Sequence, residues 1–246
     1  MRESMRRAMA PTEAEIAALP LGSNAEAAAE LLGNGGGEAL DVGCGEGKFT
    51  RSLVGRYKRV HGVDVKEKQI AAAKAAATQE GVNVDFRVAS GEALPFTDGF
   101  FDLVVFSNSL HHMPNAEIAL REAARALKPG GLLYVMEPVP AGNYHHATVL
   151  VNDETDVRMK AYEAVEGLAG AGFTPLSETI YRSTRDFADF DEWKADQIDR
   201  DVKRKALFDA RPDEVRGRFE GCADKSGGRL SFTQVFRVNL LHKADA

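Results

Sequence analysis

The segment EALDVGCGEG, residues 38–47, places three glycines behind a short apolar run and an aspartate. The apolar run predicts a buried strand over 38–43, and the spacing of apolar residues after it predicts a helix over 48–57. A strand that ends in glycines before a helix lets a ligand approach bare backbone. The segment therefore predicts a nucleotide-binding turn in an α/β protein.

The spacing of these glycines and the acids near them narrow the choice of nucleotide ligand. In the dinucleotide fingerprint G-x-G-x-x-G the third glycine stands one residue later than Gly47 does here. Asp41 stands two residues before Gly43, where its carboxylate would repel a pyrophosphate and attract a cationic amine. Asp64 ends the next expected strand, near the usual distance for an acid that binds ribose hydroxyls. A 2′-phosphate would be repelled there, so the pattern disfavours NADP and leaves NAD and S-adenosylmethionine open.

Strands and helices alternate on the carboxyl side of this turn, which predicts a parallel sheet with helices on both faces. Further strands are expected at 59–65, 82–89, 101–110 and 132–138, with helices at 68–81 and 115–127 and a turn at 128–131. The remaining pattern predicts an N-terminal helix over 12–32, an irregular connection over 138–152, a helix over 155–172, a strand over 173–182, helical stretches at 190–210 and 212–224, and a last strand over 230–243.

Composition indicates the broad class of protein. The chain has 246 residues, a formal charge of -6 and 44% apolar residues, which suffice for a packed core. Cys44 and Cys222 have no metal-ligand spacing, so we expect reduced cysteines and no metal site. Because no apolar run reaches about 20 residues and the arginines at the start precede no secretion-signal core, we expect a cytoplasmic protein without a membrane span. The acidic balance disfavours nucleic acid as a partner.

Four segments in order resemble motifs of the class I S-adenosylmethionine-dependent methyltransferases. They are ALDVGCGEG (39–47), VHGVD (60–64), GEALPFTDGFFDLVVFSNSLHHM (91–113) and LKPGGLLYVMEP (127–138). The resemblance covers about 38–138 and is to the small soluble group with an LPF…FDLV…LHH pattern. It implies a Rossmann-like, doubly wound sheet of seven mostly parallel strands, in the order 3-2-1-4-5-7-6 with the last strand antiparallel. It also implies one methyltransferase domain over 1–246, with a helical N-terminal cap (1–36), a core (37–182), a helical lid insertion (183–229) and the final strand (230–246).

The resemblance implies a cofactor site made by the ends of the first, second and fourth strands. Its residues would be Asp41 near the amino group, Gly43, Cys44 and Gly45 against the methionine part, Asp64 on the ribose, Val65 on adenine, and Asn108 beside the methyl group. Ser90 stands where many relatives carry an aspartate that bonds the adenine amino group. Gly91 and Glu92 follow it, and Glu92 either substitutes for that aspartate or faces solvent.

A general base helps only when the acceptor must lose a proton. His111 and His112 follow the fourth strand at the edge where ligands bind, and they are the catalytic candidates, with a structural pair as the alternative. Glu137, His145 and His146 are further candidates, each with a capping or exposed-loop role as its alternative. Cys44 is interpreted as a small residue in a tight turn. In the lid, Phe187, Phe190, Trp193 and Phe208 either line an acceptor pocket or anchor the lid to the core.

The resulting hypothesis is methyl transfer from S-adenosylmethionine to oxygen, nitrogen or carbon of a small molecule, with S-adenosylhomocysteine as product. We expect a monomer or homodimer. Alternatives on the same fold are modification of tRNA or protein and non-catalytic cofactor binding. The chain lacks an N/D-P-P-Y/F sequence, which disfavours methylation of a base nitrogen. An NAD-dependent dehydrogenase is disfavoured by the glycine spacing and by Asp41.

Overall fold

The computed structural model describes residues 11–33 and 35–245, so the first ten residues of the expected N-terminal cap lie outside the described part. The chain divides into two compact units. We call residues 23–137, 160–179 and 237–246 the sheet unit, and residues 1–22, 138–159 and 180–236 the helical unit. Within the described residues no helix is long and apolar enough to cross a bilayer.

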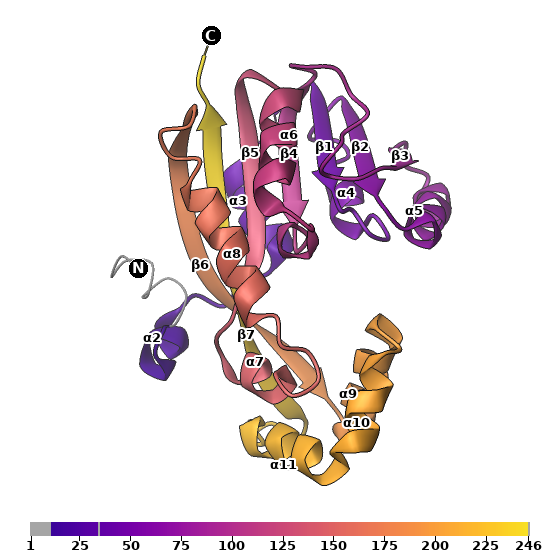
Figure 1. Cartoon of the computed structure of the whole chain (residues 1–246), viewed down its shortest axis with the longest axis vertical. Coiled ribbons are helices and arrows are strands. Elements are labelled where there is room, and N and C mark those ends of the chain that lie inside the picture. Colours follow the sequence, from indigo (N-terminus) through magenta and orange to yellow (C-terminus); the bar gives the residue numbers. More distant parts are fainter. Residues whose placement is uncertain (1–10, 34, 246) are drawn as a thin grey trace. The chain divides into compact units, whose positions relative to one another are not determined.

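Seven strands form one sheet in the order β3-β2-β1-β4-β5-β7-β6 (Figure 1), which confirms the predicted order and the antiparallel last strand. The strands are β1 (Glu38–Val42), β2 (Arg59–Asp64), β3 (Asp85–Val88), β4 (Phe101–Ser107), β5 (Leu127–Val139), β6 (Phe173–Phe187) and β7 (Leu230–Lys243). Strand β1 pairs in parallel with β2 and β4, so the carboxyl ends of these three strands meet at one edge.

The two faces of β1 follow from the alternation of side chains along a strand. Leu40 and Val42 are fully buried in the main core, together with Leu120 of helix α6 (Ala116–Ala126). Asp41 points to the opposite face, where it meets helix α4 (Lys48–Ser52). Helix α5 (Glu67–Glu80) packs Ile70 and its alanines against Phe86 in a smaller cluster. The glycine turn between β1 and α4 is thus held on a rigid strand end.

The helical unit has an aromatic core of its own. Its helices are α2 (Glu13–Ala18), α7 (Asn143–Thr148), α9 (Phe190–Arg200), α10 (Arg204–Ala210) and α11 (Pro212–Cys222). Trp193 stacks on Phe219 with ring centroids 4.5 Å apart, and Phe219 stacks on Phe232 of β7. Phe187, Phe190 and Phe208 are buried in the same cluster. These aromatic side chains therefore form a core within the unit.

Several expected boundaries are wrong, each for a local reason. The helix expected over 12–32 is two helices, α2 and α3 (Asn24–Leu32), because Pro20 and Gly22 interrupt it and Ser23 caps the second. The connection after β5 contains α7, which begins after Gly142 at a φ of 85°. Asn143 fixes α7 at this place, since its side chain donates to the carbonyl of Cys222 and accepts from the N–H of Thr233.

Three further differences follow from strand and turn chemistry. The KPGG segment at 128–131 belongs to β5, whose pairing with β4 is irregular near Phe101. Helix α8 (Thr155–Glu166) ends before Gly167, and the sixth strand continues to Phe187, so residues 183–187 of the expected lid are strand. The stretch 190–210 breaks into α9 and α10 where the Asp201 carboxylate accepts the N–H of Lys203.

Candidate active site

The glycine turn closes directly on the neighbouring strand. The backbone N–H groups of Gly43 and Cys44 both donate to the carbonyl of Val63, at 2.8 and 2.9 Å. Gly43 has a φ of 72°, and a side chain there would meet Ser109 Cβ at 2.6 Å. Gly45 has a φ of 52°, and a Cβ atom there would find no atom within 4 Å. Position 43 therefore requires glycine for packing, whereas Gly45 presents bare backbone to open space.

Asp64 ties the turn to the end of β2. Its Oδ2 accepts the N–H of Gly45 at 3.0 Å, and its Oδ1 accepts the N–H of Lys66 at 2.8 Å. A carboxylate has about four acceptor positions, so Asp64 retains capacity for two hydroxyl donors. Val65 follows it with 62% of its surface exposed, although it is a large apolar residue. The end of β2 thus offers hydrogen-bond acceptors beside an uncovered apolar side chain.

Asp41 is buried at the end of β1 and is only half satisfied. Its Oδ2 accepts the hydroxyl of Thr50 at 2.6 Å, while Oδ1 is buried with no hydrogen-bond partner among the described residues. Burial raises the pKa of Asp41 to about 7, the charge of Asp64 adds to the rise, and the Thr50 hydrogen bond opposes it. The same burial, with the carboxylates of Asp41 and Asp64, raises the pKa of Cys44, so its thiol stays protonated and is a poor nucleophile.

The end of β4 carries a strained residue. Asn108 has a φ of 55° and is the one non-glycine residue with positive φ in the described ranges 11–33 and 35–245. Its backbone N–H donates to the carbonyl of Met136 at 2.8 Å, and its Oδ1 is buried without a hydrogen-bond partner among those residues. Such strain persists only where the surrounding structure imposes it, and it is common at ligand sites.

Glu137 organises the turn that follows Asn108. Its Oε1 accepts the N–H groups of Ser109 and Leu110, at 3.0 and 2.7 Å, and its Oε2 is bonded to Nδ1 of His111. Ser109 also donates its hydroxyl to the carbonyl of Val42 at the end of β1, at 2.5 Å. His111 is buried, whereas His112 is exposed with its ring centroid 3.9 Å from that of His111. The carboxylate of Glu137 thus fixes both the turn and the orientation of His111.

The segment expected to meet adenine is held internally. Ser90 Oγ accepts the N–H of Glu92 at 3.1 Å. The carboxylate of Glu92 accepts the N–H of Asn115, the residue that caps α6. A side chain at Gly91 would meet Val42 Cγ1 at 2.8 Å. Glu92 is therefore committed to the start of α6, and a role for it or for Ser90 at adenine remains a prediction.

Together these residues have the chemistry that the methionine and ribose parts of S-adenosylmethionine need. The buried oxygens of Asp41 and Asn108 lack donors, and an ammonium group supplies donors. Gly45 leaves room for a ligand against the backbone, and Asp64 can accept from two ribose hydroxyls. The residues present therefore fit this cofactor.

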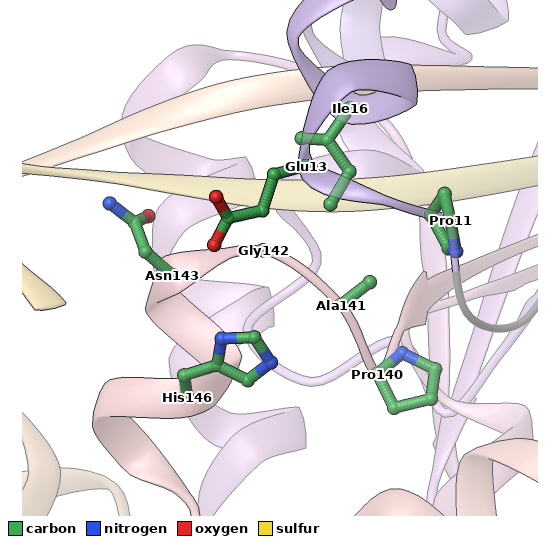
Figure 2. A pocket seen from close by; sticks show the side chains of 8 residues that line it. All are labelled: Pro11, Glu13, Ile16, Pro140, Ala141, Gly142, Asn143 and His146. Carbon is green, nitrogen blue, oxygen red and sulfur yellow. The ribbon is translucent and has the colours of Figure 1, made fainter.

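The helical unit contains a small pocket of its own, of about 110 Å³. Figure 2 shows the carboxylate of Glu13 and the ring of His146 on opposite sides of it, with Ile16, Pro140 and Ala141 as apolar walls. His145, which precedes His146 in the chain, is buried. This burial lowers the pKa of His145 to about 4, and the charges of Arg158 and His146 also lower it. His145 is therefore neutral near pH 7, whereas His146 is exposed at the pocket.

Most of the predicted cofactor residues lie at the carboxyl edge of β1, β2 and β4 in the sheet unit. Two residues of this edge were not foreseen, Thr50 and Ser109. Thr50 lies in the helix that follows the glycines, nine residues after Asp41, and it donates to the Asp41 carboxylate. A hydroxyl residue at this place in the helix is the sequence signal that could have predicted this partner of Asp41. Ser109 precedes the two histidines and has no distinguishing pattern, because its partner Val42 lies 67 positions away.

The chain is similar to methyltransferases in sequence. Residues 40–135 match the family model described as a methyltransferase domain. The chain is 39% identical over 114 residues to 27-O-demethylrifamycin SV methyltransferase of Amycolatopsis mediterranei, covering 44% of this chain and 42% of that protein. It is 30% identical over 166 residues to a ubiquinone biosynthesis O-methyltransferase of Dechloromonas aromatica, covering 58% of this chain and 71% of that protein.

The fold is shared with solved structures. A putative methyltransferase from Bacillus halodurans superposes with a TM-score of 0.67 at 23% identity, covering 91% of this chain and all of that one. At this identity the likeness establishes the fold.

Proposed function

Because the chain belongs to the class I S-adenosylmethionine-dependent methyltransferases, whose cofactor is S-adenosylmethionine, we propose that it methylates an oxygen atom of a small molecule. The observation that carries this proposal is the glycine turn bonded to Asp64 beside the unpartnered oxygen of Asp41. The preference for oxygen is supported by two relatives, one named an O-methyltransferase and the other named for a 27-O-demethylated substrate, while a further relative is named a C-methyltransferase.

The residues at the carboxyl edge of β1, β2 and β4 would bind and orient the cofactor. Little else is needed from them, because the sulfonium methyl group of the bound cofactor is already activated for displacement. Asp41 would hold the amino group, Asp64 the ribose hydroxyls, and the backbone from Gly43 to Gly45 would lie against the methionine part. Val65 would cover the adenine. Asn108 would lie beside the methyl group, and alignment of the acceptor with that methyl group would supply most of the rate enhancement that such a reaction needs.

His111 is the candidate base for a hydroxyl acceptor. Its Nδ1 is bonded to the buried carboxylate of Glu137, which fixes the orientation of the ring, so that Nε2 would be the nitrogen that takes the proton of the acceptor. His111→Gln would lower turnover by about 10²-fold or more while leaving the affinity for S-adenosylhomocysteine unchanged. Equal losses in His111→Gln and in the control His242→Gln would exclude this role.

The proposal is tested by calorimetry followed by methyl transfer. S-adenosylmethionine and S-adenosylhomocysteine should bind, and NAD should not. Labelled S-adenosylmethionine should then transfer its label to a hydroxyl-bearing compound in a metabolite extract. Label on nitrogen or carbon would correct the acceptor atom, and binding of NAD alone would overturn the proposed chemistry.

A further inference from the structure

We propose that Thr50 is a positioning residue for the cofactor, which holds the Asp41 carboxylate so that its second oxygen faces the cofactor's amino group. The inference rests on the proposed cofactor site and adds to it a residue that does not itself touch the ligand. Thr50 and Asp41 are 0% and 1% exposed, so solvent cannot substitute for the hydrogen bond between them.

The geometry assigns the two carboxylate oxygens different partners. Oδ2 accepts the Thr50 hydroxyl at 2.6 Å, a short bond typical of an O–H donor to a charged acceptor. Oδ1 has no hydrogen-bond partner among the described residues, and a buried acceptor without a donor is costly to maintain. The fixed bond on Oδ2 leaves Oδ1 as the oxygen available to a ligand.

Charge gives the hydroxyl a second effect. Asp41 is buried near a second carboxylate, Asp64, and both conditions favour its neutral form. The Thr50 hydroxyl opposes them, because a hydrogen bond to the charged form favours ionisation. An ionised Asp41 attracts an ammonium group, whereas a neutral one does not. Thr50 would therefore set the pH range over which the amino group is bound well.

The experiment measures the affinity for S-adenosylhomocysteine by calorimetry between pH 6 and pH 9. Thr50→Val replaces the hydroxyl by a methyl group of similar size, and we expect about ten-fold weaker binding at pH 7. The rise of affinity with pH should also move to higher pH in this variant. Thr50→Ser should restore both properties, and Thr78→Val on the exposed face of α5 should change neither.

A double-mutant cycle separates positioning from a general loss of structure. In an Asp41→Asn background the Thr50→Val change should have little further effect on affinity, because the carboxylate on which Thr50 acts is gone. If Thr50→Val does not fold, Thr50→Ala compared with Thr50→Ser provides the same contrast. Unchanged affinity and pH profile in the hydroxyl-free variant, or additive losses in the cycle, would overturn the inference while wild-type binding still supports the proposed function. Absence of wild-type binding would overturn both.

Discussion

The carboxylate of Asp64, at the end of β2, accepts a hydrogen bond from the backbone N–H of Gly45 at 3.0 Å. This bond links the acid expected to hold the ribose to the turn expected to hold the methionine part. The two halves of the proposed cofactor site are therefore joined by a hydrogen bond within the protein.

Replacing Asp64 should weaken cofactor binding through both of its roles. Asp64→Ala removes the acceptor for the ribose hydroxyls and leaves the N–H of Gly45 without its partner. We expect a loss of about 1 to 3 kcal/mol in the affinity for S-adenosylhomocysteine, measured by calorimetry. Asp199→Ala, at an exposed position on α9, is the control. Unchanged affinity in Asp64→Ala would remove this residue from the site.

The stability of the ligand-free protein should depend on pH through Asp41. The pKa of Asp41 in the folded protein is about 7, above its ordinary value of 3.8. The contribution of Asp41 to the free energy of unfolding is therefore fully present below pH 3.8 and is lost as the pH rises to about 7. The loss is at most about 4 kcal/mol. Urea unfolding should show that Asp41→Asn gains stability relative to wild type over this range. A constant difference between the two proteins from pH 4 to pH 8 would contradict the assignment.

His145 should make the stability of the helical unit change with pH in the opposite direction, falling as the pH falls. The pKa of His145 in the folded protein is about 4, below its ordinary value of 6.5. The contribution of His145 to the free energy of unfolding is therefore present above pH 6.5 and is lost as the pH falls toward 4. His145→Asn should flatten this decline, and His146→Asn, at the exposed neighbouring position, should not. The fluorescence of Trp193, the one tryptophan of the chain, reports the unfolding of this unit. Equal acid sensitivity in wild type and His145→Asn would refute the prediction.

Glu137 should be important for stability as well as for the site. Glu137→Ala leaves the N–H groups of Ser109 and Leu110 and the ring of His111 without their acceptor. We expect the free energy of unfolding to fall by about 2 to 4 kcal/mol in urea titrations. Glu117→Ala, whose side chain is 72% exposed, should change it by less than about 0.5 kcal/mol.

The aromatic core should stabilise the helical unit. Phe219→Ala removes a buried ring that stacks on both Trp193 and Phe232. The expected loss is about 3 to 5 kcal/mol, seen as an earlier change in Trp193 fluorescence during urea unfolding. Leu207→Ala, at a side chain 40% exposed, is the comparison variant. A loss as small as that of Leu207→Ala would mean that this cluster is loosely packed.

Strands β1, β2 and β4 could be predicted because they are short, mostly apolar runs between glycines and periodic helices, and the order of the seven strands followed from the family resemblance. Asp41, Gly45 and Asp64 could be placed at one edge for the same reason, since parallel strands bring their carboxyl ends together. The helix breaks at Pro20 and Asp201 depend on single residues within periodic stretches, which makes boundaries hard to predict. The bond between Glu137 and His111 could not be foreseen, because the two residues lie 26 positions apart and meet only through the pairing of β4 with β5.

The most direct test of the proposed function is to incubate the protein with S-adenosylmethionine labelled in its methyl group and a fractionated cell extract. The label should appear on an oxygen atom in the small-molecule fraction, together with S-adenosylhomocysteine, and should require the wild-type residue at Asp64. Label confined to the tRNA or protein fraction, or S-adenosylhomocysteine binding without any transfer, would contradict the account.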